Sequence, residues 1–188
     1  MEYYKIIDAG DFQTYSEQFM LYYYTHKNNF IPRNRFWNPL KTECLENCSR
    51  YNPALFEGIS KFGTIKQMAI LFVFDDSATL HIDHKNGLNE NVKARLNIPL
   101  LNCSGSFTAF FEMDESTFGL GELTEPTKIL VWPTEIRNTL KPVCEVELIQ
   151  PTILRTSSPH TVFCRTCNFP RVSLTISFEN DVANYLSE

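Results

Sequence analysis

The sequence contains a histidine and an aspartate two positions apart, in the segment His81-Ile82-Asp83 at the end of an expected strand. Side chains alternate along a strand, so positions two apart project from one face and place an imidazole beside a carboxylate. Such a pair can supply two ligands to a metal ion. The motif is short and also arises by chance, and two solvated loop residues would look the same, so it needs support from the rest of the chain.

A second imidazole occurs much later, where Pro159-His160 opens another expected strand. Two histidines and one carboxylate can occupy one triangular face of an octahedral Fe(II) ion and leave up to three positions open. A zinc ion would more often have four closed protein ligands. Taken alone, His160 is more often a hydrogen-bonded histidine at a strand start than a metal ligand.

The last apolar strand, Arg171 to Phe178, alternates between two kinds of side chain. One face carries the polar residues Arg171, Ser173, Thr175 and Ser177, and the other carries Val, Leu, Ile and Phe. Arginine can hold a carboxylate through two parallel charge-assisted hydrogen bonds, to which Ser173 would add a third donor. This face suits a buried anionic ligand. The alternative is an ordinary strand with one solvated face.

Together these residues resemble the Fe(II)/2-oxoglutarate-dependent oxygenase family, whose double-stranded β-helix carries H-x-D, a distal His and R-x-S. Three segments support the resemblance, which covers roughly Thr64 to Phe178: Leu80 to His84, Arg95 to Cys103, and the tail from Pro151 through Arg171-Val-Ser173. The resemblance implies that His81, Asp83 and His160 bind Fe(II). It also implies that Arg171 and Ser173 hold the distal carboxylate of the co-substrate 2-oxoglutarate, with dioxygen as the second co-substrate.

Other polar residues of the same segments are candidates for contact with the co-substrate. Asn97 lies in the segment Leu96-Asn-Ile-Pro99, where its amide could hydrogen-bond 2-oxoglutarate, although it could equally be a polar residue at a strand end. Thr108 and Arg95 are weaker candidates for this role. His84 lies three positions after His81 and would point to the opposite face of a regular strand, so it is left out of the predicted site.

The elements that must position these residues are visible in the hydrophobic pattern. Apolar residues at spacings of three and four predict a helix from Asp11 to about His26, and two short helices are expected, one near Thr42 to Ser49 and one after Asn52-Pro53 that ends at Gly63. From Thr64 onward, runs rich in Ile, Val, Phe and Thr predict strands. These strands are expected at Ile65–Phe74, Ala78–His84, Val92–Leu101, Phe107–Met113, Lys128–Trp132, Val143–Ile149, Thr152–Arg155, His160–Cys164 and Val172–Phe178.

The expected fold is therefore mainly β with N-terminal helices, a double-stranded β-helix of the jelly-roll or cupin-like kind. With 188 residues, 43% of them hydrophobic, the chain is expected to form a single domain. Residues 1–63 would be a helical support segment, residues 64–178 the double-stranded β-helix core, and residues 179–188 a C-terminal tail. The segment from Asp114 to Thr127 shows no clear strand pattern and has the length of a lid.

Charge and apolar runs bear on the partners of the protein. The net charge of −5 disfavours nucleic acid, and no apolar run approaches the length of a membrane span. The N-terminus lacks the pattern of a secretory signal, so we expect a cytoplasmic protein whose six cysteines are free thiols. A four-thiolate zinc site from Cys44, Cys48, Cys164 and Cys167 is an alternative.

The expected function is hydroxylation of a small molecule or a protein side chain by a 2-oxoglutarate-dependent dioxygenase. The sequence identifies neither the substrate nor the oligomeric state. Phe36-Trp37 and Trp132 could line a substrate pocket, although aromatic residues in a chain of this composition usually belong to the core. Two alternatives stay open: a cupin-like metal enzyme that does not use 2-oxoglutarate, and a non-catalytic β-barrel binding domain. The latter should bind neither iron nor 2-oxoglutarate.

Overall fold

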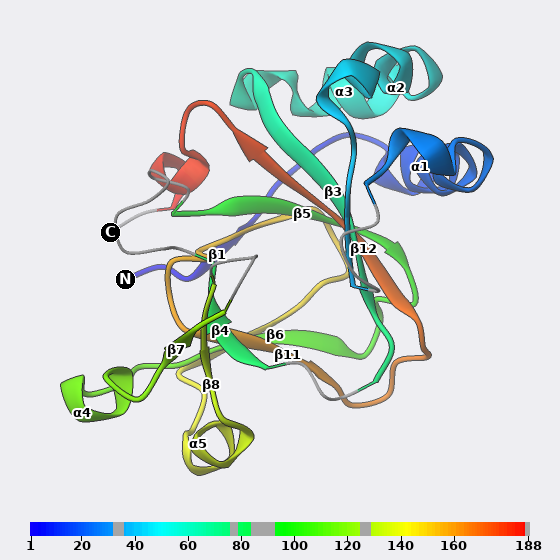
Figure 1. Cartoon of the computed structure of the whole chain (residues 1–188). Helices are drawn as coiled ribbons and strands as arrows, with labels where there is room; N and C mark the ends of the chain where they lie inside the picture. Colours follow the sequence, from blue (N-terminus) through cyan, green and yellow to red (C-terminus); the bar gives the residue numbers. More distant parts are fainter. Residues whose placement is uncertain (32–35, 76–78, 84–92, 125–128, 187–188) are drawn as a thin grey trace.

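Two six-stranded antiparallel sheets form the body of the protein in the computed structural model, which describes residues 1–31, 36–75, 79–83, 93–124 and 129–186. The sheets face each other across a common interior (Figure 1). We call them the major sheet, with strand order β1-β10-β5-β12-β3-β2, and the minor sheet, with strand order β7-β8-β4-β11-β6-β9.

The strands of the major sheet are β1 (Tyr4–Ile6), β2 (Trp37–Pro39), β3 (Ile65–Val73), β5 (Arg95–Leu101), β10 (Thr152–Leu154) and β12 (Arg171–Phe178). The strands of the minor sheet are β4 (Leu80–Ile82), β6 (Ser106–Phe110), β7 (Glu122–Leu123), β8 (Leu130–Trp132), β9 (Cys144–Glu147) and β11 (His160–Cys164). Four strands of each sheet, β10-β5-β12-β3 and β4-β11-β6-β9, form the body of a double-stranded β-helix. Along the chain they alternate between the sheets except at the step from β6 to β9, which are both in the minor sheet. The predicted fold class is confirmed.

Each of the nine predicted strands has a counterpart, and the structure adds three short strands at the sheet edges. β1 pairs with β10 and β2 pairs with β3, so these two strands depend on partners that are distant in the sequence, whereas β7 pairs with the next strand along the chain, β8. Ala78, His84, Val92 and Lys128, which the sequence predicts at strand ends, lie outside the described residues.

Three helices cover the outer face of the major sheet (Figure 1): α1 (Phe12–Thr25), α2 (Leu45–Tyr51) and α3 (Pro53–Ile59). Asp11 begins α1 by accepting a hydrogen bond from the backbone N–H of Thr14. Phe19 and Tyr22 of α1 are fully buried in one cluster with Ile70 and Leu174 of the sheet. Burial of each such large apolar side chain contributes about 1.5–3 kcal/mol, so this layer anchors β3 and β12 from outside. The 3-10 turns η1 (Lys27–Asn29), η2 (Thr42–Cys44) and η3 (Ser60–Phe62) complete the layer.

Two further helices lie outside the minor sheet: α4 (Glu115–Phe118) and α5 (Thr134–Thr139). The buried residues of this face include Leu80, Ile82, Phe111 and Trp132. Trp132 therefore belongs to the core and not to a substrate pocket. The segment predicted as a lid, Asp114 to Thr127, holds α4 and β7, and residues 125–127 within it lie outside the described residues. A last 3-10 turn, η4 (Val182–Tyr185), follows β12.

The expectation of six free thiols is wrong for one pair, because the structure joins Cys164 and Cys167 in a disulfide. Their Cα atoms lie 5.4 Å apart, since Cys164 ends β11 and Cys167 lies in the turn that follows. This separation is within the ordinary range for a disulfide. Among the described cysteines, Cys44, Cys48, Cys103 and Cys144 are free. No described cysteine belongs to a metal-binding cluster, so the zinc alternative has no support.

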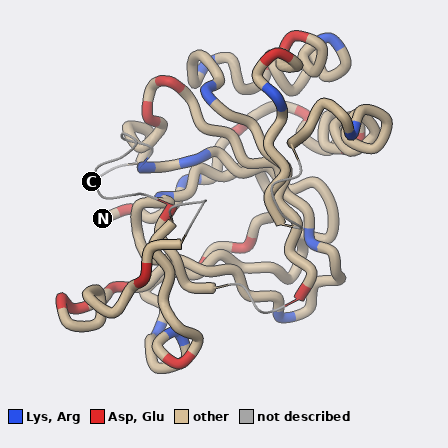
Figure 2. Tube along the Cα trace, viewed as in Figure 1, with Lys and Arg blue, Asp and Glu red and all other residues tan. Residues whose placement is uncertain are grey.

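Charged residues of both signs are interspersed over the helices and loops, while the strands are largely uncharged (Figure 2). In the part of the chain that the structure describes, no helix is long and apolar enough to cross a membrane.

Candidate metal centre

His81, Asp83 and His160 come together at one end of the barrel interior. One potential ligand atom from each lies within 4.8 Å of the other two. His160 of β11 pairs directly with His81 of β4 in the register of the minor sheet, and Asp83 follows β4 immediately. The backbone N–H of Asp83 donates to the Thr156 carbonyl (3.0 Å), which fixes the aspartate beside the start of β11. The structure thus brings together the three side chains that the sequence predicts as metal ligands.

Both imidazoles face the interior of the barrel. His160 also pairs with Phe110 of β6, and residues paired in register share a face of the sheet. Phe110 packs against Leu154 of the major sheet, so this face of the minor sheet is turned toward the opposite sheet. His160 and Phe110 are buried, whereas 22% of the His81 side chain and 21% of the Asp83 side chain are exposed. The cluster is therefore reachable from solvent on one side.

The backbone determines which nitrogen of each histidine is free. Nδ1 of His81 lies 2.8 Å from the Thr79 carbonyl oxygen, and Nδ1 of His160 lies 2.8 Å from the Ser158 carbonyl oxygen. A carbonyl oxygen can only accept, so each Nδ1 carries the proton and donates it. In the neutral ring this leaves the lone pair on Nε2. Histidine ligands of metal sites are oriented in this manner by a second hydrogen bond.

The protonation states of the cluster favour metal binding at neutral pH. Burial alone would raise the pKa of Asp83, but the hydrogen bond from His81 and the charge of Arg95 hold it well below its usual range. Burial and the charge of neighbouring His81 lower the pKa of His160 to about 4. Burial also acts to lower the pKa of His81, yet its hydrogen bond to Asp83 raises it above the ordinary value. A proton on His81 is therefore the main competitor for a metal ion.

Arg95 supports the aspartate from the facing sheet. Its Nε atom lies 3.1 Å from Oδ2 of Asp83, while the other carboxylate oxygen, Oδ1, lies 3.5 Å from Nε2 of His81. The carboxylate therefore has one oxygen on the histidine side and one on the arginine side. Sequence reasoning treated Arg95 only as a weak candidate for co-substrate contact and missed this ion pair.

The polar face of β12 lies inside the barrel. Val172, Leu174, Ile176 and Phe178 pack in the cluster beneath the helices, and alternation turns the other four residues toward the minor sheet. All eight residues of β12 are buried, so the alternative of a solvated face is wrong. Within this interior are Arg171 (3% exposed) and Ser173 (0% exposed).

Arg171 is a buried cation that lacks a counter-ion among the described residues. The described ion pairs include none with Arg171, and its Nε atom has no hydrogen-bond partner there. The hydroxyl of Ser173 is likewise buried and unpartnered. Burial lowers the pKa of the Arg171 guanidinium, and the neighbouring Cys103 thiol acts to raise it. A desolvated guanidinium on the same strand face as an unpartnered hydroxyl has the donors that a bound anion would need.

The remaining predicted residues lie on the inner faces of the two sheets. Asn97 of β5 is buried in register with Thr175 of β12, and its amide makes a long hydrogen bond of 3.4 Å to the Arg95 carbonyl. Thr108 of β6 is buried in register with Val162 of β11. Both are placed along the interior, and neither touches the three metal-ligand candidates directly in the hydrogen bonds described. His84 lies outside the described residues.

Two backbone carbonyl groups contribute to the centre without depending on the type of side chain at their positions. The carbonyl groups of Thr79 and Ser158 orient the histidines through the backbone, so the side-chain types at these positions carry no signal. Only their position, two residues before each histidine in an extended segment, could have located these carbonyl groups from the sequence.

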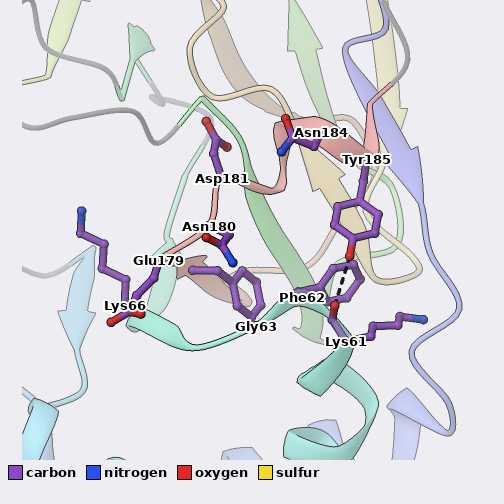
Figure 3. A pocket seen from close by; sticks show the side chains of 10 residues that line it. Lys61, Phe62, Gly63, Lys66, Glu179, Asn180, Asp181, Asn184 and Tyr185 are labelled. Carbon is purple, nitrogen blue, oxygen red and sulfur yellow. Dashed lines mark hydrogen bonds between the residues drawn. The ribbon is translucent and has the colours of Figure 1, made fainter.

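A cavity of about 670 Å³ lies elsewhere, between η3, the start of β3 and η4 (Figure 3). Its lining contains charges of both signs, including Lys61, Lys66 and Glu179. The one acid of this cavity that reaches β5, Asp181, is already saturated by backbone N–H groups of Lys93, Ala94 and Ala183. Asp181 therefore acts as a clamp that holds the backbone just before β5, next to Arg95.

Solved structures with a similar backbone include AviO1 from Streptomyces viridochromogenes Tue57, which is 10% identical with a TM-score of 0.52 over 96% of this chain and 91% of that chain. Two others are the non-heme alpha-ketoglutarate-dependent epimerase SnoN from nogalamycin biosynthesis (12% identity, TM-score 0.49, 93% of this chain and 75% of that chain) and a Pseudomonas putida prolyl-4-hydroxylase (11% identity, TM-score 0.47, 95% and 92%). The likeness to AviO1 is one of fold, and the other two TM-scores are too low to support an inference. No family model and no curated protein matches the sequence.

Proposed function

We propose that the protein is an Fe(II)- and 2-oxoglutarate-dependent oxygenase that acts on an organic substrate at the centre formed by His81, Asp83 and His160. The observation that carries the proposal is Arg171, a guanidinium 3% exposed on the inner face of β12 with no acidic partner among the described residues. Leaving a charge buried and unpaired is strongly destabilising, so a ligand carboxylate is the natural counter-ion.

The donor set fits iron. Two imidazole nitrogens and one carboxylate oxygen within 4.8 Å of one another match the three-residue face that binds Fe(II) and leaves sites open for other ligands. The hydrogen bonds to Thr79 and Ser158 keep both Nε2 lone pairs available. Asp83, ionised at neutral pH, supplies the negative charge that a divalent cation needs.

Each part of the chain has a distinct task in this reaction. Arg171 and Ser173 would bind the distal carboxylate of 2-oxoglutarate. His81, Asp83 and His160 would hold the metal at the exposed end of the interior. Iron with 2-oxoglutarate and dioxygen would supply the oxidant that hydroxylates a substrate C–H bond, while 2-oxoglutarate is converted to succinate and carbon dioxide. The buried faces of the two sheets exclude water from the site, which protects a reactive centre from side reactions.

The test is turnover of 2-oxoglutarate. Purified protein with Fe(II), 2-oxoglutarate and dioxygen is incubated with a panel of amino acids, peptides and small metabolites, and succinate is measured. We expect metal-dependent succinate formation that at least one panel compound stimulates and that His160→Ala abolishes. Bound iron without 2-oxoglutarate consumption would favour a cupin-like metal enzyme, and binding of neither would favour a non-catalytic barrel.

A further inference from the structure

We propose that Arg95 binds a carboxylate of a ligand beside the metal, in addition to pairing with Asp83. This inference rests on the proposed function, since it concerns the same centre. It assigns an anion-binding role to a residue on β5, on the sheet opposite the histidines.

The first observation is that the guanidinium group of Arg95 has buried donors without hydrogen-bond partners. Its Nε atom forms an ion pair with Oδ2 of Asp83 (3.1 Å), yet neither Nε nor a second donor, Nη1, makes a hydrogen bond to a described residue, and both atoms are shielded from solvent. A buried donor without a partner is costly, by the desolvation of a charged group. If Arg95 did no more than pair with Asp83, an arrangement in which Nη1 faced solvent or a backbone carbonyl would have a lower free energy.

The position of the guanidinium is the second observation. Its carbon Cζ lies 5.6 Å from the centre of the Trp37 ring, so the indole restrains the guanidinium group through a cation–π contact. Asp83 holds it from the other side, and the Asp181 clamp fixes the backbone two residues upstream through the N–H of Lys93 (2.9 Å). A restrained fork of donors loses little freedom when it takes up a carboxylate.

The charge balance of the centre is the third observation. A divalent metal, Arg95 and Arg171 together bring four positive charges, while Asp83 is the only acid that forms an ion pair with either arginine among the described residues. Two carboxylates of 2-oxoglutarate and that of Asp83 supply three negative charges. One positive charge is left over in a site with little solvent, which favours a further anionic group and disfavours a cationic substrate.

Two sources can supply the carboxylate that Arg95 binds: the end of 2-oxoglutarate that lies at the metal, or the substrate. The probes that separate them are 2-oxoglutarate and 2-oxopentanoate, which keeps the 2-oxo acid end and lacks the distal carboxylate. Binding is measured by calorimetry to the full chain saturated with Mn²⁺, in wild type, Arg95→Gln and Arg171→Gln. Saturation with metal removes any effect that Arg95 has on metal affinity through Asp83.

If the co-substrate is the source, Arg95→Gln weakens both 2-oxo acids about tenfold or more, whereas Arg171→Gln weakens 2-oxoglutarate alone. If the substrate is the source, both 2-oxo acids bind Arg95→Gln normally. In that case a panel of mono- and dicarboxylic acids should include compounds that raise the melting temperature of the wild-type Mn²⁺·2-oxoglutarate complex, while their amides do not. The same acids should leave the melting temperature of Arg95→Gln unchanged. Either result supports the inference.

The inference fails if wild type binds 2-oxoglutarate but Arg95→Gln alters neither the 2-oxo acid affinities nor the response to the acid panel. Arg95 would then be a positioning residue for Asp83 only. If wild type saturated with Mn²⁺ binds no 2-oxoglutarate, the proposed function fails instead, and the two failures are thereby distinguished.

Discussion

His81 and His160 face each other directly in the register of β4 and β11, and their ring centroids lie 4.3 Å apart. This pairing brings together two candidate metal ligands that are distant in the sequence, because β4 and β11 are neighbours only in the folded sheet. Each ring is held by a backbone carbonyl, so the two Nε2 atoms and Asp83 are in place before a metal binds. Preorganisation of this kind reduces the cost of assembling the site.

Loss of one imidazole should remove metal binding while the fold survives. We expect His81→Ala to weaken Fe(II) binding by more than about 100-fold, because a direct ligand matters at least as much as the outer residues that support ligands. The side chain of His81 is partly exposed at a strand end, so circular dichroism should be unchanged. His26→Ala, which alters a histidine outside the centre, is the matched control and should bind iron normally. Normal binding by His81→Ala would remove His81 from the site.

Replacing Arg171 with lysine should weaken 2-oxoglutarate without affecting the metal. Lysine keeps the charge but loses the planar pair of donors, so the loss should be roughly 1.5–3 kcal/mol, or about 10- to 150-fold in the dissociation constant. Arg165→Lys on the same β11–β12 connection is the control, because Arg165 is exposed and pairs with Glu145. Unchanged 2-oxoglutarate affinity in Arg171→Lys would refute its role as the carboxylate partner.

The two sheets show where sequence reasoning succeeds. The alternation in β12 predicted both of its faces, and the H-x-D motif at the end of β4 predicted a histidine–carboxylate pair, which the fold brings together with His160. The edge strands β1 and β7 escaped prediction because each consists of three or fewer residues and is stabilised by its partner strand. The disulfide is local, but it was missed because the cysteines were expected to be free thiols in a cytoplasmic protein. The Arg95–Asp83 ion pair depends on tertiary placement, which no local pattern encodes.

Thiol counting should distinguish the cysteines. We expect four free thiols in denatured, unreduced protein and six after reduction, because Cys164 and Cys167 are paired. In the folded protein Cys48 should react most slowly with iodoacetamide, since burial raises its pKa to about 12 and leaves almost no thiolate at pH 8. Its labelling should rise only when the helical layer unfolds. Mass spectrometry of the alkylated peptides gives both results, and rapid labelling of native Cys48 would contradict the burial of α2.

A glycine next to the disulfide turn tests the β11–β12 connection. Gly105 has φ of +75°, and a Cβ there would lie 3.0 Å from the backbone nitrogen of Cys167 and closer still to the Thr166 hydroxyl. Gly10 has φ of +76° but open space around it, which makes it a matched control. Gly10→Ala should cost about 1 kcal/mol in the free energy of unfolding from backbone strain, and Gly105→Ala about 2 kcal/mol or more because of the added clash. Equal losses in urea unfolding would contradict this packing.

The most direct test of the account is a calorimetric titration of 2-oxoglutarate into the protein without dioxygen, performed with and without Fe(II). The account predicts one binding site whose affinity depends on the metal, because the co-substrate is held at one end by the iron of the His81, Asp83 and His160 centre and at the other by Arg171. Chelation of the metal should weaken binding strongly, and the weak remainder should disappear in Arg171→Gln. Absence of 2-oxoglutarate binding to the iron-loaded wild-type protein would contradict the central claim.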